Sequence, residues 1–483
     1  MYIGIDLGTS GVKSIVMSLE GEILASKSIE LSVSRPKPLW SEQMPAEWWH
    51  ATCESIRGLR EQIDLSGVKA VGLSGQMHGA TLLNAEGEVI RPAILWNDGR
   101  CAAECNELEL AVPESRAITG NIMMPGFTAP KLKWVRNNEP ENFEKIAKVL
   151  LPKDYLRFKM TGDFASDMSD SAGTCWLDVN ARDWSEELLT ATGLTREQMP
   201  TLFEGSEVTG VLLEQVAEQW GLPQVPVVAG GGDNAAGAVG VGIIKPGQAM
   251  LSLGTSGVYF AVSDGFISNP ESALHSFCHA LPNCWHTMSV ILSAASCLKW
   301  VASLTGFEDV GEMIKEVEQN ADETSSVIFL PYLSGERTPH NNPDAKGVFF
   351  GMTHSTTKLE LAQAVLEGVG FAFADGFDAL HVTKMIPDEV SLIGGGARSE
   401  YWRQMLADIV GLPLTYRKGG DVGPALGAAR LAALAVEENA DIEKICPVPE
   451  LVQLHQPNSD KQAYYNAKRE TFQSLYARIS DLF

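Results

Sequence analysis

The chain has 483 residues, of which 45% are hydrophobic, so it is long enough to bury the cores of more than one domain. Its 61 acidic and 37 basic residues leave a formal net charge of −24 at pH 7. Such an acidic chain lacks the basic face that binding to nucleic acid or an anionic membrane requires. If the ligand is itself anionic, a metal ion and local N–H groups must offset the global repulsion.

The first half alternates strand and helix signals. Apolar runs predict strands at 2–7, 12–18, 22–30 and 69–74, and an amphipathic pattern predicts a helix over 45–62. A further strand at 225–229 leads into three glycines, Gly230–Gly232, and a helix of small residues is expected over 234–241.

The same pattern restarts after residue 245. We expect strands near 250–262, 284–290 and 389–393, helices near 292–304 and 358–381, and a helical tail from about 440 to 483. The sequence therefore predicts two α/β domains with a repeated pattern of elements, one over 1–245 and another over 246–483. Gly368, Gly370 and Gly376 weaken the long helix and indicate close helix–helix approach.

Eight cysteines are scattered along the chain without a C-x-x-C spacing, and no matching His/Cys pair follows Cys101 and Cys105. Reduced thiols are therefore expected. The chain opens directly into a strand containing Asp6, which does not resemble a signal peptide. The uncharged stretch 273–298 is interrupted by His, Pro and Asn, which does not suit a membrane span. These features predict a cytoplasmic protein without a membrane or nucleic-acid partner.

A hexapeptide, Leu-Gly-Thr-Ser-Gly-Val, occurs twice, at 7–12 and at 253–258. Each copy joins two apolar runs, so each predicts a hairpin with glycine where a positive φ is needed. Adjacent backbone N–H groups and hydroxyls in such a turn form a concave anion site. An ordinary tight hairpin would explain one copy, but the duplication favours two turns that bind successive phosphates of one nucleotide.

The residues beside the two turns differ in a useful way. Asp6 precedes the first copy, whereas Ser252 precedes the second. One carboxylate near two phosphate turns suits Mg²⁺, which keeps most of its waters and takes few protein ligands. Lys13 could add a positive charge. A Walker A motif is absent from the sequence, because Lys13 follows Val12 rather than glycine.

Asp233 follows the predicted strand at 225–229 and the three glycines. The stretch from Gly230 to Ala235 fits a dinucleotide-binding pattern, but Asp233 would then repel a pyrophosphate. A helix N-cap is the simplest alternative. Ligands also bind at strand ends in α/β folds, where this carboxylate could accept a proton from a substrate hydroxyl. Asn234 would be a neutral partner for another hydroxyl.

Two further polar clusters follow predicted strands. His78 lies between glycines in the stretch 75–79, which exposes it, so it is either structural or a sugar ligand. The stretch Trp96–Arg100 offers an aromatic ring, an amide, a carboxylate and a guanidinium. These groups suit a polyhydroxyl ligand and a surface salt bridge equally well.

Two longer stretches, Gly126–Asn138 and Gly347–Glu367, resemble the two signatures of the FGGY carbohydrate kinases. That family lies within the actin/Hsp70/hexokinase-like superfamily, and the resemblance extends over roughly residues 1–440. It implies two actin-like (ribonuclease H-like) ATPase domains with an interdomain cleft. It also implies ATP and Mg²⁺ as the co-substrate and metal of a sugar kinase.

The resemblance implies a role for each matching residue. Asp233 would be the catalytic base and Asp6 would lie by the metal. The two hairpins would hold phosphates, and the turn after the strand at 389–393 would lie against the adenosine. The nucleotide-binding residues implied in this way, with Lys13 included, are Gly8, Thr9, Ser10, Gly11, Lys13, Gly254, Thr255, Gly395, Gly396 and Ala397.

The substrate loops at 76–79, 96–100, 230–234 and 334–340 are most similar to those of the xylulose-phosphorylating branch of the family. This similarity implies ATP-dependent phosphorylation of D-xylulose to D-xylulose 5-phosphate, with Met77, His78 and Asn234 orienting the sugar. One alternative is a related kinase acting on another ketose, a polyol or a sugar acid. Another is a nucleotide-dependent sugar-sensing switch on the same fold. The oligomeric state stays open, with a homodimer as one candidate.

Overall fold

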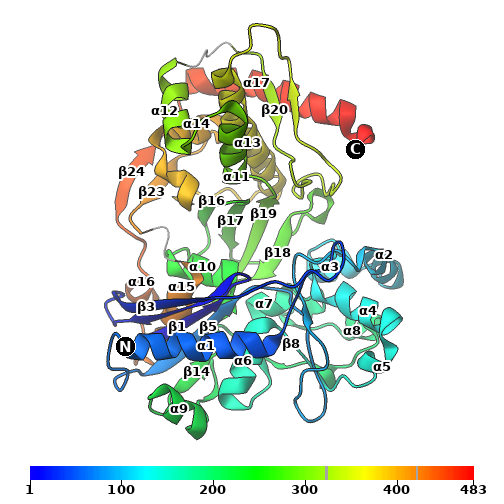
Figure 1. Ribbon diagram of the computed structural model, residues 1–483, viewed down its shortest axis with the longest axis vertical. Helices are drawn as coiled ribbons and strands as arrows, with labels where there is room; N and C mark the ends of the chain where they lie inside the picture. The colour runs from blue at the N-terminus through cyan, green and yellow to red at the C-terminus, as the bar shows by residue number, and fades with distance from the viewer. Residues whose placement is uncertain (321–324, 420–422) are drawn as a thin grey trace.

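Two mixed sheets organise the chain, one in each of two α/β bodies (Figure 1). The computed structural model describes residues 1–320, 325–419 and 423–483. Within that part, each of the two large sheets has seven strands. The first sheet is built from residues before 233 and the second from residues after 247, so the α/β pattern does occur twice.

The first sheet has the order β13-β14-β5-β1-β2-β3, and β15 also pairs with β5. Its strands are β1 (Tyr2–Leu7), β2 (Gly11–Met17), β3 (Ile23–Glu30), β5 (Ala70–Gly75), β13 (Val208–Val211), β14 (Pro226–Val228) and β15 (Gly231–Gly232). The second sheet has the order β18-β19-β17-β16-β22-β23-β24. Its strands are β16 (Gln248–Leu253), β17 (Gly257–Ser263), β18 (His275–Cys278), β19 (Trp285–Ile291), β22 (Glu389–Ile393), β23 (Leu414–Arg417) and β24 (Leu451–His455).

The two sheets repeat one pattern of strand directions. In each, a hairpin (β1–β2 or β16–β17) pairs antiparallel with a third strand on one side. On its other side, each hairpin pairs with two successive parallel strands and then an antiparallel edge strand. The turn after β5 and the turn after β22 are therefore equivalent positions, and both lie at the carboxyl ends of parallel strands.

Helices cover the sheets. The longer ones are α1 (Pro45–Arg60), α2 (Ala102–Ala111), α4 (Thr128–Asn138), α6 (Pro152–Thr161), α10 (Asp233–Gly240), α11 (Ala295–Thr305), α12 (Val310–Asn320), α13 (Lys358–His381), α14 (Glu400–Val410), α15 (Gly423–Val436) and α17 (Ser459–Ile479). The shorter ones are α3 (Ser115–Thr119), α5 (Pro140–Phe143), α7 (Met168–Ala172), α8 (Glu186–Thr192), α9 (Glu214–Trp220) and α16 (Ile442–Ile445). None of the helices in the described ranges is long and apolar enough to cross a membrane.

Short strand pairs complete the fold outside the two large sheets. They are formed by β4 (Glu42–Gln43) with β7 (Ala93–Ile94), β6 (Thr81–Leu83) with β8 (Lys148–Leu150), β9 (Ala165–Asp167) with β12 (Thr201–Phe203), β10 (Leu177–Asp178) with β11 (Asp183–Trp184), and β20 (Ile328–Leu330) with β21 (Val348–Phe350).

Helix α15 lies on the first sheet, although its residues come late in the chain (Figure 1). A side chain at Gly4 of β1 or Gly72 of β5 would clash with the backbone of this helix. Gly427 within α15 likewise lies against the backbone of α10. Glycines therefore let the helix approach the sheet directly, and a segment from the expected second domain completes the first body.

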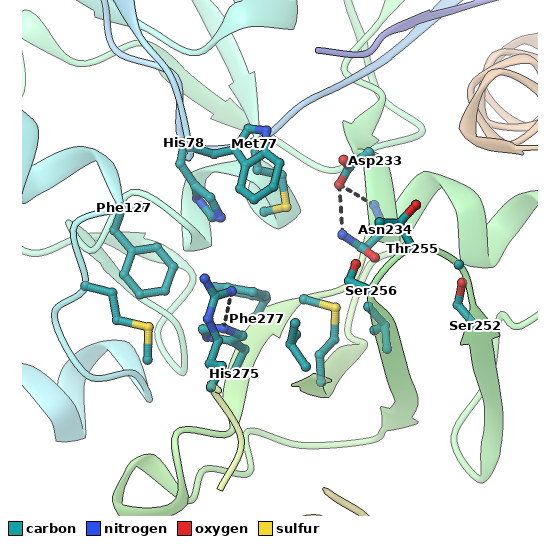
Figure 2. A pocket seen from close by; sticks show the side chains of 18 residues that line it. Met77, His78, Phe127, Asp233, Asn234, Ser252, Thr255, Ser256, His275 and Phe277 are labelled. Carbon is teal, nitrogen blue, oxygen red and sulfur yellow. Dashed lines mark hydrogen bonds between the residues drawn. The ribbon is translucent and has the colours of Figure 1, made fainter. Parts of the chain in front are cut away.

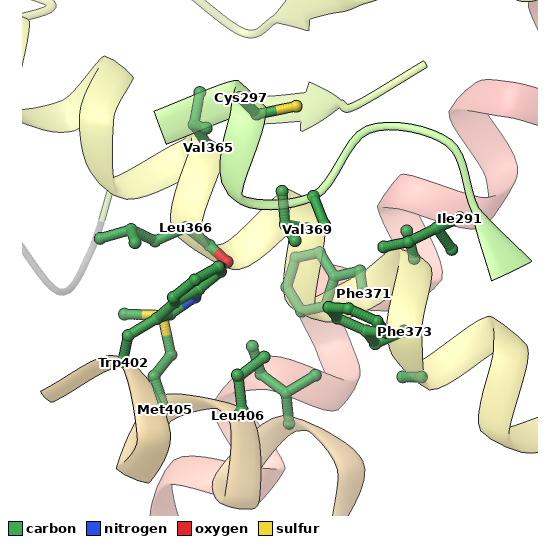
Figure 3. Packing of buried hydrophobic residues seen from close by; sticks show 14 of the residues in the cluster. Ile291, Cys297, Val365, Leu366, Val369, Phe371, Phe373, Trp402, Met405 and Leu406 are labelled. Atoms are coloured by element: carbon green, nitrogen blue, oxygen red, sulfur yellow. The ribbon is translucent and has the colours of Figure 1, made fainter. Parts of the chain in front are cut away.

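Helix α13 forms the centre of the second core (Figure 3). Leu366 of this helix faces Trp402 of α14, whereas Val365 lies beside Cys297 of α11, so α13 packs against elements on both sides. The expected close helix–helix approach occurs at Gly370, where a side chain would meet Ile409 of α14. Gly368 and Gly376 instead admit the strands β20 and β19.

The tail differs from its predicted helical structure at β24, which pairs with β23 as the last strand of the second sheet. Its apolar residues Leu451, Val452 and Leu454 are exposed, so no buried face marks the segment in the sequence. Because an edge strand forms through pairing with a distant segment, local patterns do not reveal it. The remainder of the tail holds the short helix α16 and the long helix α17.

Candidate active site

Residues from both bodies line a cavity of about 350 Å³ (Figure 2). Its polar side chains include residues of the turn after β5, the start of α10, β16 with the hairpin turn that follows it, β18 and the loop at 331–347. Apolar and aromatic side chains form much of the remaining wall. The lining residues are Met77, His78, Trp96, Met124, Gly126, Phe127, Asp233, Asn234, Ser252, Gly254, Thr255, Ser256, Val258, His275, Phe277, Met288, Val290 and Arg337.

A second, more open cavity of about 820 Å³ lies beside α11. It is lined by Leu253, Gly254, Thr255, Ala295, Ser296, Lys299, Trp300, Ser303, Leu304, Gly395 and Gly396. Gly254 and Thr255 of the second hairpin line both cavities. The hairpin turn therefore separates a smaller cavity that carries Asp233 from a larger one that carries the glycine turn after β22.

The second hairpin is fixed at the start of α11. The backbone N–H of Ala295 donates to the carbonyl of Gly254, and that of Ala294 donates to the carbonyl of Thr255, both at 2.9 Å. The hydroxyl of Ser296 also donates to the Thr255 carbonyl, at 2.7 Å. The turn between the cavities is thus held by the helix N-terminus behind it.

The first hairpin does not line either cavity in the described structure, but it contacts the wall of the smaller one. The Thr9 hydroxyl donates to Oε1 of Gln76 at 3.0 Å and accepts from Nε1 of Trp96 at 2.9 Å. Gln43 Nε2 donates to the Thr9 carbonyl at 2.8 Å. Gly8, Ser10 and Gly11 complete this turn, with the Gly8 N–H donating to the Gly11 carbonyl.

Asp6 lies on a row of residues that runs across three strands. In the register of the sheet it is opposite Lys13 of β2 and Ser74 of β5. Burial and the nearby Asp233 carboxylate raise the pKa of Asp6 to about 7. Its Oδ1 is buried without a hydrogen-bond partner among the described residues. A cation at this position would compensate both carboxylates.

Asp233 is the first residue of α10, and Gly232 occupies the N-cap position. The N-cap interpretation of Asp233 is therefore wrong. Its Oδ1 instead accepts the backbone N–H of Asn234 at 2.7 Å and the Asn234 side-chain amide at 2.9 Å (Figure 2). Burial raises the pKa of Asp233 to about 6, although the bonds from Asn234 oppose this shift. At neutral pH the carboxylate can still accept a proton.

His78 adopts a left-handed backbone conformation, with φ of 67°. Its Nδ1 lies 2.7 Å from the carbonyl of Gly173, and its ring packs edge-on against Phe127 at 4.9 Å. Burial and, to a smaller extent, Lys131 lower the pKa of His78 to about 3, so the ring is neutral. Because a carbonyl only accepts, Nδ1 carries the proton and Nε2 is left to accept a hydroxyl from a ligand.

Lys131, in the stretch that resembles the first family signature, supports the same turn. Its buried ammonium donates to the carbonyls of His78 at 2.8 Å and Gly126 at 2.7 Å. Both of those residues line the smaller cavity. The long signature thus has a physical role here, because its lysine holds two segments of the cavity wall together.

The Trp96–Arg100 cluster divides into two parts. Trp96 lines the smaller cavity, as a ligand-binding role requires. Asp98 and Arg100 instead form a buried pair, with Nη2 of Arg100 at 2.6 Å from Oδ2 of Asp98. The Arg100 guanidinium also stacks on the ring of Trp40 at 3.6 Å. The salt bridge is therefore structural and lies inside the protein.

Arg337 and His275 join the cavity from the second body, and neither was predicted as a site residue. Nη1 of Arg337 donates to Nε2 of His275 at 3.3 Å (Figure 2). Nδ1 of His275 lies 3.1 Å from Oδ1 of Asn121. The loop at 334–340 was the signal for Arg337, since it matched a substrate loop of the resembling family. His275 has no comparable signal, because it lies in an ordinary buried strand.

The two cavities together suit the transfer of a group between two ligands. The smaller one offers a carboxylate, a neutral imidazole acceptor, an amide and a guanidinium, which suits a ligand with several hydroxyls. The larger one has small residues along one wall and Trp300 along another, with Gly395 open to it. Ala397 is buried beneath that glycine turn and does not line the cavity.

Comparison with known proteins identifies the family of the chain. The N-terminal domain of the FGGY family of carbohydrate kinases matches residues 1–240, and the C-terminal domain of that family matches residues 249–436. A xylulose kinase of Escherichia coli K12 is 64% identical over 482 residues, which cover 100% of both chains.

Solved structures agree with this assignment. The structure of a xyloylose kinase from Brucella ovis has a TM-score of 0.95 and 48% identity, and the match covers 100% of both chains. The structure of a gluconate kinase from Lactobacillus acidophilus has a TM-score of 0.93 at 26% identity, covering 99% of this chain and 98% of that one. The chain therefore belongs to the FGGY family of carbohydrate kinases.

Proposed function

We propose that the chain transfers the γ-phosphoryl group of ATP to a hydroxyl of D-xylulose and forms D-xylulose 5-phosphate. The observation that carries this proposal is the single hairpin turn shared by two cavities, with Asp233 and His78 on one side of it. The full-length similarity to a xylulose kinase at 64% identity supports the choice of sugar.

In the proposed reaction, Asp233 accepts the proton of the attacking sugar hydroxyl. The hydroxyl oxygen forms a bond to the γ-phosphorus while the bond from that phosphorus to the bridging oxygen of ADP breaks. His78 Nε2 and the Asn234 amide would each bind another hydroxyl and so orient the sugar. Arg337 supplies guanidinium donors from the opposite wall, so sugar binding would bring residues of both bodies onto one ligand.

The nucleotide would occupy the larger cavity, with its phosphates toward Gly254 and Thr255 and its adenosine against Gly395 and Gly396. Mg²⁺ would fit beside Asp6, which lies near the carboxylate of Asp233 and whose buried Oδ1 has no hydrogen-bond partner in the part of the chain that the structure describes. When bound there, the ion would neutralise phosphate charge that otherwise meets a strongly acidic protein. Lys13, opposite Asp6 in the sheet, would add a second positive charge.

A coupled assay of ADP release tests the proposal. The purified protein is supplied with ATP and Mg²⁺ and with D-xylulose, D-ribulose, glycerol or D-gluconate in parallel. We expect kcat/KM for D-xylulose to exceed the values for the other three by at least tenfold. Equal or greater values with another acceptor would overturn the choice of sugar and leave a kinase of different specificity.

The likeness to a gluconate kinase fold makes a sugar acid the second candidate substrate. Arg337 is the observation that favours it, since its guanidinium lines the cavity and could pair with a carboxylate. A nucleotide-dependent sugar-sensing switch would need no base, so it predicts ATP binding without phosphoryl transfer to any acceptor. The same assay separates these outcomes.

We also infer a reducing cytoplasmic location, because all eight cysteines are free and most are buried. A homodimer stays a prediction, and light scattering during gel filtration would measure it directly.

A further inference from the structure

A cluster of buried charges in the first body lies beneath the segment Ala229–Gly232, which directly precedes Asp233 and is called the catalytic segment below. The Lys153 ammonium contacts three carboxylates, those of Asp154, Asp167 and Asp170, at 2.6, 2.7 and 3.0 Å. Arg157 pairs with the same Asp154 at 2.7 Å. All five side chains are fully buried. Replacing such a cluster with apolar residues often leaves stability unchanged, so a buried cluster is weak support for a purely stabilising role.

A chain of hydrogen bonds connects this cluster to the residue before Asp233. Asp167, held by Lys153 through Oδ1, accepts the hydroxyl of Ser169 with its other oxygen. The same Ser169 hydroxyl accepts the backbone N–H of Gly232 at 3.1 Å. Since a hydroxyl that donates to a carboxylate presents its lone pairs elsewhere, Ser169 is oriented to receive that N–H.

The other end of the catalytic segment is held by the same cluster. Nη2 of Arg157 donates to the carbonyl of Ala229, directly after β14. The segment from Ala229 to Gly232 is therefore fixed at both ends, at a carbonyl by Arg157 and at an N–H by Ser169. Gly231 lies too close to the Ser169 hydroxyl and to Ala280 for a larger residue to fit easily.

Helix α7 extends the same support to the sugar side. Ser169 lies in its first turn, and Gly173 directly after its last residue accepts the Nδ1 proton of His78 at 2.7 Å. Ser169, which fixes the segment before Asp233, thus lies only four positions before Gly173, which orients His78. Asp167 caps the start of α7 by accepting the N–H groups of Ser169 and Asp170.

We propose that Ser169 is a positioning residue for phosphoryl transfer, which holds the Gly232 peptide so that Asp233 is aimed at the sugar hydroxyl. The proposal rests on the proposed function, in which Asp233 is the base. Lys153 and Asp167 orient Ser169, and α7 ties its position to that of His78. Small displacements of a catalytic group reduce turnover strongly, because the reacting atoms must lie close together and aligned.

The test compares Ser169→Ala with Ser171→Ala, a matched control on the same helix. Ser171 is equally buried, but its hydroxyl donates to the hydroxyl of Ser166 and does not accept the backbone N–H of Gly232. For both variants we would measure kcat, KM for D-xylulose, KM for ATP and the melting temperature. We expect Ser169→Ala to lower kcat by ~10–100-fold with KM for ATP unchanged. Ser171→Ala should change kcat by no more than about twofold at a similar melting temperature.

A double variant shows whether Ser169 acts through Asp233. If it does, adding Ser169→Ala to Asp233→Asn should cause no further loss of kcat, because the base is already missing. Multiplied losses, or equal kcat values for Ser169→Ala and Ser171→Ala, would overturn the positioning role.

Failure of the proposed function gives a different result. If a folded Asp233→Asn protein retains turnover, Asp233 is not the base. The positioning role of Ser169 then loses its premise and is overturned as well. Should Ser169→Ala not fold, Ser169→Cys takes its place, since a thiol of similar size accepts an N–H only weakly. The same loss of kcat is then expected, and a wild-type kcat in the folded cysteine variant would overturn the proposal.

Discussion

Thr9 and Trp96 are joined by a hydrogen bond, in which the indole N–H donates to the threonine hydroxyl at 2.9 Å. Thr9 lies in the first hairpin, which was predicted to bind phosphate, whereas Trp96 lines the cavity proposed for the sugar. The Thr9 hydroxyl also donates to Gln76, so both of its roles are used within the protein. A phosphate at this hairpin would therefore meet backbone N–H groups rather than the hydroxyl of Thr9.

This relationship predicts that Thr9→Val affects the sugar more than the nucleotide. The change keeps the branched shape but removes two hydrogen bonds and frees the Trp96 indole in the cavity wall. We expect KM for D-xylulose to rise by ~3–10-fold, since each lost bond is worth about 0.5–1.5 kcal/mol. KM for ATP should change less than twofold in the same steady-state measurements. Thr9→Ser is the control and should behave as wild type; a change confined to KM for ATP would contradict the prediction.

Asp233→Asn should abolish most of the turnover without unfolding the protein. The amide keeps the size of the side chain but cannot accept the hydroxyl proton, and general-base catalysis is worth typically ~10²–10⁴-fold. We therefore expect kcat with D-xylulose to fall by that factor, with KM for ATP nearly unchanged. The exposed Asp264, changed to Asn, controls for the loss of one charge. A well-folded Asp233→Asn protein with more than a tenth of wild-type turnover would exclude Asp233 as the base.

The pH dependence of the reaction should report the Asp233 carboxyl. Its pKa of about 6 lies above the ordinary value, so the base becomes protonated as pH falls through 6. At saturating Mg²⁺ we expect kcat/KM for the sugar to be flat above pH 7 and to fall tenfold per pH unit below about 6. Rates in overlapping buffers from pH 5 to 8.5 would measure this limb. The residual activity of Asp233→Asn should not fall in this way below pH 6. If the fall persists in this variant, a group other than Asp233 causes it.

Asp6→Asn should reduce both the sugar kinase activity and any slow ATP hydrolysis without sugar. Both reactions would use Mg²⁺ beside Asp6, because this side chain lies near the Asp233 carboxylate and its Oδ1 has no partner among residues 1–320, 325–419 and 423–483. The loss should be largest at limiting Mg²⁺, in a titration of the metal at fixed ATP. Full activity of the variant at limiting Mg²⁺ would show that the metal assignment is wrong.

The same substitution should stabilise the protein at alkaline pH. The pKa of Asp6 is about 7 in the folded chain and near 3.8 when exposed, so the folded state holds a proton that the unfolded state releases. Folding stability therefore falls as pH rises from about 4 to 7, by up to ~4 kcal/mol. The free energy of unfolding would be measured in urea without metal. It should be higher for Asp6→Asn than for wild type at pH 8, and the difference should be much smaller at pH 5. Equal gaps at both pH values would count against the raised pKa.

His78→Asn should distinguish the structural role of Nδ1 from the proposed sugar-binding role of Nε2. Asparagine tolerates the left-handed backbone at this position, and its amide can donate to Gly173 as Nδ1 does. It is too short to replace Nε2 in the cavity. We expect KM for D-xylulose to rise by ~10-fold, while the melting temperature changes by only a few degrees. A large fall in melting temperature with normal KM would favour the purely structural interpretation of His78.

The sequence by itself determined the α/β class, the repeat and much of the element order. Strand 2–7, helix 358–381 and strand 389–393 match the structure to the residue, because strong apolar patterns and a capping box mark them. The repeated hexapeptide marks the same hairpin in both sheets, and the carbohydrate kinase family followed from the two long signatures. These features are local, so patterns along the chain are enough to reveal them.

Only the tertiary structure decided which of these residues meet. It placed Arg337 and His275 opposite His78, and brought α15 across the chain onto the first sheet. The sequence left a ligand cluster and a surface salt bridge open for Asp98 and Arg100, and the structure buries this pair, with Arg100 also held by the distant Glu42 and Trp40. Such contacts join segments far apart in the chain, and a single sequence carries no periodic signal for them. The charges under Asp233 are the clearest case, since Lys153 and Ser169 acquire their proposed role only where α6 and α7 come to lie beneath Gly232.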